Sequence, residues 1–194
     1  FHLTTETTEL GDAWYIVDSK LDFGGKNINV RGYSKILLLN DCGIDNLGSL
    51  QLNDSAAVYI YSESLDESKM GYINIKASFG LPGIGNNAAD ATVTICGGKI
   101  TAQGGYNSAG IGGRNDTINI YGGTINAIGG KHGAGIGNGY ETFGTAVVVN
   151  IYDGNINATG GEYAAGIGSG YMDNDATVNI YGGNINATGS EYAA

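Results

Sequence analysis

The stretch NIYGGTINAIGGKHGAGIG at residues 119–137 decides the fold, because a close copy follows as NIYDGNINATGGEYAAGIG at residues 150–168. Aliphatic residues alternate with polar residues at residues 118–121 and again at 124–127. Alternation at a period of two predicts short β-strands with one buried face. The glycine pair between the two runs predicts a tight corner. The stretch therefore predicts two strands joined by a glycine corner, and the chain repeats the unit.

The repeat has a constant part and a variable part. Its isoleucine anchors are Ile95, Ile120, Ile151 and Ile180, which are 25, 31 and 29 residues apart. Another isoleucine always follows the anchor after five residues, and the isoleucine of Gly-Ile-Gly follows after 16 in the first three copies. All differences in length fall between Gly-Ile-Gly and the next anchor. A constant wall with one loop of variable length is expected when strands must stay in register.

The repeat excludes several solenoid classes. Leucine-rich repeats have a similar period, but every leucine lies at or before Leu81. The chain after Leu81 has no apolar stripe at helical spacing, and the calcium-binding GGxGxD motif does not occur. We therefore predict an all-β, right-handed parallel β-helix (solenoid) with about three short strands per coil and roughly seven coils.

The chain is expected to form a single continuous domain with two parts. Residues 77–194 hold the regular repeats, and residues 1–76 hold an N-terminal cap and irregular coils. The cap is expected within residues 1–34, and a charged loop at 62–71 is expected to project from a corner. Because the chain ends within a repeat, we expect further coils and the remainder of a longer surface protein after Ala194. Strands are predicted at the runs WYIV, NINV, KILLL, LQL, VYIY and INIK.

Composition excludes some partners. The net charge is −10 and the chain has only 9 Lys and Arg residues, which argues against binding a nucleic acid. No stretch reaches the roughly 18 apolar residues that membrane insertion needs. Cys42 and Cys96 are the only cysteines, and their unlike contexts favour free thiols over a disulfide.

The motif GGxIxAxGGxxxAGIGxG resembles the β-helical repeats of adhesin-like bacterial cell-surface proteins. It occurs as GGTINAIGGKHGAGIGNG and DGNINATGGEYAAGIGSG, and the resemblance covers residues 77–194. It implies a secreted or cell-surface location and adhesion or contact with a glycan, a polysaccharide or another host or cell-surface ligand. It implies no catalytic residue.

Stacked coils bring equivalent residues into columns about 5 Å apart, which predicts outward ladders. Aligned aromatic rings and amides suit a glycan, so these columns are the predicted ligand-binding residues. The same ladders would also serve as plain stabilisers of the wall. The predicted residues are Tyr121, Tyr152 and Tyr181, then Asn119, Asn150 and Asn179, and at another corner Tyr163 and Tyr192.

Other residues support weaker alternatives. Glu162 and Glu191, with Lys131 and His132 one coil away, are the only candidates for a polysaccharide lyase or glycosidase. Asp173 and Asp175 are the candidate metal ligands, and calcium is the one cofactor considered. The sequence thus favours a glycan-binding surface module over an enzyme, and leaves a passive structural stalk as a further alternative.

Overall fold

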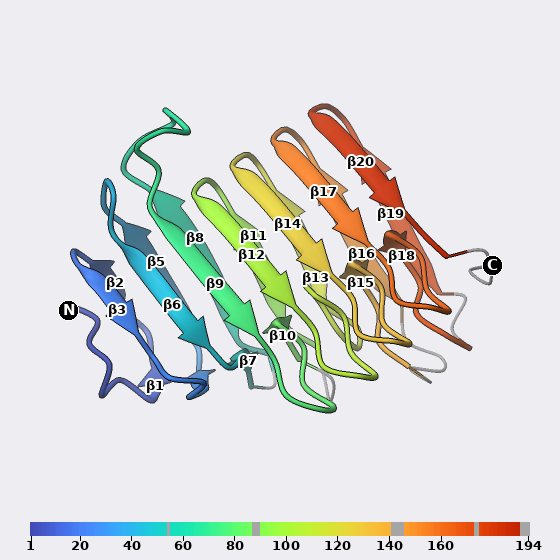
Figure 1. Ribbon diagram of the computed structural model, residues 1–194, viewed down its shortest axis with the longest axis horizontal. Coiled ribbons are helices and arrows are strands. Elements are labelled where there is room, and N and C mark those ends of the chain that lie inside the picture. Colours follow the sequence, from blue (N-terminus) through green and yellow to red (C-terminus); the bar gives the residue numbers. More distant parts are fainter. Residues whose placement is uncertain (54, 87–89, 141–145, 173–174, 191–194) are drawn as a thin grey trace.

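The protein is a parallel β-helix, as predicted. The computed structural model describes residues 1–53, 55–86, 90–140, 146–172 and 175–190. Figure 1 shows the strands stacked side by side from the N-terminus to the C-terminus along the long axis. Every strand pair in the described residues is parallel, and the strands form three stacked sheets. The described residues contain no helix that could span a membrane.

Each coil passes through sheet A, then sheet C, then sheet B. Within the described residues sheet A has seven strands, so the chain makes six complete turns between the first and the last of them. The anchor isoleucines pair in register, with Ile95 beside Ile120 and Ile151 beside Ile180. The strands of sheet A are β2 (Trp14–Val17), β5 (Tyr33–Leu38), β8 (Ala57–Ser62), β11 (Thr92–Ile95), β13 (Thr117–Ile120), β16 (Val147–Ile151) and β19 (Ala176–Ile180).

Sheet C follows sheet A after the glycine corner of each regular coil. Gly123 is in the left-handed region with φ 102°, which only glycine adopts at little cost. The six strand-like runs predicted before residue 77 all form strands, while β1 (Glu9–Leu10), β3 and β6 are additional. The strands of sheet C are β3 (Lys20–Asp22), β6 (Gly43–Leu47), β9 (Tyr72–Lys76), β12 (Lys99–Gln103), β14 (Thr124–Ile128), β17 (Asn155–Thr159) and β20 (Asn184–Thr188).

Sheet B closes each coil and is the least regular of the three. Its first four strands form one sheet, and the next row pairs only through single bridges from Ile111 to Ile84 and to Ile136. In the later coils its strands are two residues long, at the Gly-Ile-Gly motif. The strands of sheet B are β1 (Glu9–Leu10), β4 (Ile28–Val30), β7 (Leu50–Leu52), β10 (Ile84–Gly85), β15 (Ile136–Gly137) and β18 (Ile167–Gly168).

The core is a narrow column of aliphatic side chains. Isoleucine and alanine alternate inward on sheet C, as in Ile125 and Ala127, and both are fully buried. Burying each isoleucine removes apolar surface from water and contributes about 2 kcal/mol relative to exposure. One buried cluster runs through the stack from Leu3 to Ala158, so residues 1–76 and 77–194 share one core.

The N-terminal coils carry the larger core side chains. Leu3, Leu10 and Phe23 are buried within residues 1–34, and that segment already pairs in all three sheets through β1 to β4. The segment at 62–71 joins β8 to β9 and extends beyond the corner (Figure 1), where the Glu67 carboxylate accepts a hydrogen bond from Thr124 Oγ1 at 3.1 Å. Both cysteines are free thiols, and burial raises the pKa of each.

Candidate functional site

The predicted tyrosine ladder forms at the corner between sheets A and C. The ring centroids of Tyr121 and Tyr152 lie 4.5 Å apart with an interplanar angle of 2°, and those of Tyr152 and Tyr181 lie 5.0 Å apart at 10°. Burial by the neighbouring rings raises the pKa of Tyr152, and the nearby Tyr121 adds to the shift. Because the inner ring faces cover one another, this ladder presents mainly edges and hydroxyl groups to solvent.

The predicted asparagine ladder lies on the outer face of sheet A. Asn150 Nδ2 donates to Asn119 Oδ1 at 3.0 Å, and Asn179 Nδ2 donates to Asn150 Oδ1 at 2.9 Å. Sheet C carries a similar ladder, in which Asn157 donates to Asn126 at 3.3 Å. Each amide thus uses part of its hydrogen-bonding capacity on the next coil, which stabilises the stack.

The predicted catalytic cluster is only partly brought together. Lys131 Nζ and a Glu162 carboxylate oxygen lie 3.3 Å apart at the corner between sheets C and B. His132 follows Lys131 directly in the sequence. A hydrogen bond with Tyr163 and the ion pair with Lys131 lower the pKa of Glu162. A glycosidase acid needs a raised carboxyl pKa, so this pairing is unfavourable for that role. Glu191 and Tyr192 lie outside the described residues.

His132 is the centre of an aromatic cluster that the sequence did not predict. Its ring contacts Tyr106 edge-on at 5.1 Å between centroids, and the rings of Tyr140, Tyr163 and Tyr171 lie 5.2, 5.5 and 5.3 Å away. Phe79 extends the cluster by stacking on Tyr106 at 5.5 Å. We call these six residues the aromatic cluster: Phe79, Tyr106, His132, Tyr140, Tyr163 and Tyr171.

The backbone explains how four successive coils supply these rings. The corner residues stack through hydrogen bonds in which the His132 amide donates to the Tyr106 carbonyl at 3.1 Å. The segments after β15 and β18 then fold back, so that the Tyr140 amide donates to Asn107 and the Tyr171 amide donates to His132, each at 2.9 Å. Rings from both sides of the two-residue strands therefore meet over sheet B.

The glycines of the corner make this close stacking feasible. A side chain at Gly130 would overlap the carbonyl oxygen of Gly105 in the preceding coil. With glycine there, the neighbouring Lys131 and His132 side chains point outward and remain half-buried. Lys131 Nζ lies over the rings of Tyr106 and Tyr163, 5.9 and 5.6 Å from their centroids, and its ion pair with Glu162 raises its pKa.

The cluster is accessible and combines rings with polar groups. Phe79, Tyr106 and Tyr171 are 74, 44 and 37% exposed. His132 Nδ1 forms a hydrogen bond with the Asn107 side-chain oxygen at 2.8 Å. The four tyrosine rings lie at 32° to 78° to the imidazole. Phe79 stacks on Tyr106 at 15° and Tyr140 stacks on Tyr171 at 10°, so the cluster combines stacked and tilted rings and is less regular than the parallel tyrosine ladder.

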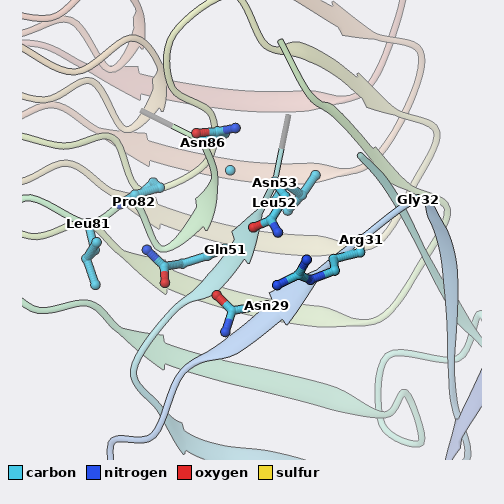
Figure 2. A pocket seen from close by; sticks show the side chains of 10 residues that line it. Asn29, Arg31, Gly32, Gln51, Leu52, Asn53, Leu81, Pro82 and Asn86 are labelled. Atoms are coloured by element: carbon cyan, nitrogen blue, oxygen red, sulfur yellow. The ribbon is translucent and has the colours of Figure 1, made fainter. Parts of the chain in front are cut away.

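A groove of about 630 Å³ lies on the outer side of sheet B in the N-terminal coils. Asn29 and Gln51 occupy the same register position on β4 and β7, between inward residues that are buried. Figure 2 shows Asn29, Arg31 and Gln51 next to one another, with Leu81 and Pro82 along the side. Amides and one guanidinium thus line its floor, and an apolar segment forms its wall.

Only one of the two candidate metal ligands can be placed. Asp173 lies outside the described residues, and Asp175 is placed next to β19, where its carbonyl accepts a hydrogen bond from the Val147 amide at 3.0 Å. Over the described ranges, no three residues among His, Cys, Asp and Glu are grouped so that they could hold a metal ion. Calcium binding therefore stays a prediction.

The comparisons with known proteins agree with the architecture. Four segments match the model of a beta helix repeat, at residues 93–113, 118–140, 149–171 and 178–194. Neither a curated protein nor a solved structure gives a significant match to the chain. Each matched segment contains an anchor isoleucine of sheet A and the strand of sheet C that follows it, and the first three segments also contain the Gly-Ile-Gly motif of sheet B. The chain is therefore a β-helical repeat protein.

Proposed function

We propose that this β-helix is an extracellular bacterial surface module that binds a polysaccharide, and that the aromatic cluster is its main contact. The observation that carries the proposal is the grouping of His132 with five other aromatic rings, next to the Lys131–Glu162 pair and Asn107. Sugars place their apolar faces on aromatic rings and their hydroxyl groups on neighbouring polar side chains. A binding site of this kind is mostly apolar with a few oriented polar groups.

The predicted tyrosine ladder supports this function less directly. Its inner ring faces are covered by neighbouring rings, and the asparagine ladders beside it are hydrogen-bonded along the stack. These contacts favour a stabilising role for Tyr121, Tyr152 and Tyr181. A contribution of their edges and hydroxyl groups to glycan binding stays a prediction, which the same experiment tests.

The proposal is tested by screening the chain on an array of bacterial, plant and animal glycans and measuring the affinity of each hit by calorimetry. Tyr106→Ala and Tyr171→Ala remove accessible rings, and each is expected to weaken binding about tenfold or more, which is about 1.4 kcal/mol. Tyr33→Ala, at a 63% exposed ring on β5, is the matched control and is expected to bind as the unaltered chain does.

The outcomes separate the candidate functions. Absence of any glycan ligand overturns the proposal and favours a structural stalk. Loss of binding in Tyr152→Ala, together with unchanged binding in Tyr106→Ala, would show that the glycan binds at the tyrosine ladder and not at the aromatic cluster. Reducing ends or unsaturated products released from a bound polysaccharide, and lost in Glu162→Gln, would establish the enzymatic alternative instead.

A further inference from the structure

The groove and the aromatic cluster lie on the same face of the β-helix. Ile84, Ile111, Ile136 and Ile167 form one column of sheet B. The groove lies over the coils up to that of Ile84, and the cluster begins in that same coil with Phe79 and extends to the coil of Ile167. In the later coils, His132 lies before β15 and Tyr140 after it, and their rings are 5.2 Å apart. The cluster therefore continues the line of the groove along the helix axis.

The segment at 79–82 connects the two features. Phe79 stacks on Tyr106 in the cluster, while Leu81 and Pro82 line the groove. The segment is fixed to the next coil, because the Gly105 amide donates to the Leu81 carbonyl at 2.8 Å. One continuous segment of the protein therefore contributes both to the cluster and to the wall of the groove, and a ligand that binds the cluster lies next to that wall.

The cation that lines the groove and the cation of the cluster are each paired with a carboxylate. Arg31 Nε donates to the Glu9 carboxylate at 2.7 Å in the groove, and Lys131 pairs with Glu162 in the cluster at 3.3 Å. The chain as a whole has a net charge of −10, which repels a polyanion. The remaining groups on the groove floor are the neutral amides of Asn29, Gln51 and Asn53. The electrostatics therefore favour a ligand without charge.

Resting on the proposed function, we infer that the groove and the cluster form one continuous track for a neutral, linear polysaccharide that lies parallel to the helix axis. The track covers six rows of sheet B, from β4 to β18. Five spacings of about 4.8 Å give a length of about 24 Å, which accommodates about one sugar ring per coil. The aromatic cluster holds one end of the ligand, and the groove amides hold the hydroxyl groups of the other.

The length of the track gives a direct test. For a neutral glycan that binds in the array, affinities are measured by calorimetry for a series of oligosaccharides from two to eight units. We expect affinity to rise about tenfold or more between the trimer and the hexamer, and to change less than about twofold beyond it. Affinity that does not depend on length would overturn the track while leaving binding at the cluster intact.

Variants in the groove provide the second arm. Gln51→Ala and Arg31→Gln are expected to weaken hexamer binding about fivefold or more and to leave trimer binding unchanged, because the trimer occupies the cluster alone. Gln103→Ala is the matched control, since Gln103 is a half-buried amide on β12 in sheet C and lines neither the groove nor the ring contacts of the cluster. Circular dichroism and thermal melting confirm that each variant is folded before its affinity is compared.

Each result bears on one of the two proposals. Equal hexamer affinity in Gln51→Ala, Arg31→Gln and the unaltered chain would exclude the groove and overturn the track. Tighter binding of an acidic polysaccharide than of its neutral counterpart would overturn the assignment to uncharged ligands. Failure of every glycan to bind would instead overturn the proposed function. A glycan that binds with the same affinity at every length would overturn the track alone.

Discussion

Gly110→Ala is expected to destabilise the β-helix by about 3 kcal/mol, although it adds only a methyl group. Gly110 is the first glycine of the AGIG phrase, and its amide donates to Ala134 in the next coil at 3.1 Å. A Cβ there would lie 2.7 Å from the Ala102 oxygen, the Gly135 oxygen and the Ile128 nitrogen. Ordinary Cβ contacts are 3.4 Å or longer, and all three atoms belong to backbone that the stack holds in place.

The overlap cannot be relieved by rotating a side chain, so the coils must separate locally. Overpacking of this kind costs about 1–3 kcal/mol and sometimes more, and three simultaneous backbone contacts place Gly110→Ala at the upper end. The matched control is Gly11→Ala, since no atom lies within 4 Å of a Cβ there and its φ is not positive. Gly11→Ala is expected to change stability by less than about 1 kcal/mol.

The assay is thermal and urea unfolding followed by circular dichroism. For a chain of this size, a loss of about 3 kcal/mol lowers the melting temperature by about 6–12 °C. A shift of less than about 2 °C in Gly110→Ala would refute the steric reasoning. An equal loss in Gly11→Ala would show that glycine itself, and not the contact, is what stability requires.

Two further predictions concern the core. Burial raises the pKa of Asp116 well above its usual value, while amides of Asn86 and Ala91 donate to the carboxylate and lower it. The folded chain therefore holds a proton that the unfolded chain releases above about pH 4, so stability falls as pH rises from there toward the folded pKa. Asp116→Asn is expected to remove that slope and to stabilise the fold at pH 7. Identical melting curves of the unaltered chain from pH 4 to 7 would contradict this. Ile120→Ala, at a fully buried anchor, is expected to lower the free energy of unfolding by about 3 kcal/mol. Ile180→Ala in the same column is expected to lower it by only about 1 kcal/mol, because Ile180 is 56% exposed. Equal losses in urea unfolding would be inconsistent with this difference in burial.

The architecture was predictable because the constant part of the repeat fixes two sheets. The alternation from Ile118 to Tyr121 and the five-residue step to Ile125 give the strands of sheets A and C, and the 16-residue step gives the short strand at Ile136. Strand β1 was missed because it is only two residues long, and β3 and β6 were missed because they lack a clear apolar alternation. In β6 the pairing shifts between Ile44 and Leu47, where Asn46 has a φ of 50°, and this irregularity breaks the pattern that alternation requires.

The aromatic cluster was not predictable to the same degree. Tyr163 and the Lys131–Glu162 column were identified from register alone. Tyr140 and Tyr171 lie in the segment of variable length, and each reaches His132 only because the chain folds back after sheet B. The one available signal was the recurrence of tyrosine four residues after Ile136 and Ile167, in GIGNGY and GIGSGY.

The position of the proposed site follows from the difference between the sheets. On sheets A and C, equivalent side chains must match from coil to coil, so Asn119, Asn150 and Asn179 satisfy one another along the stack. A ligand there competes with contacts that hold the coils together. Sheet B has short strands and loops of variable length, so residues beside it can differ between coils without breaking the register. A distinctive binding surface is therefore compatible with the repeat mainly on sheet B, which is where the groove and the aromatic cluster lie.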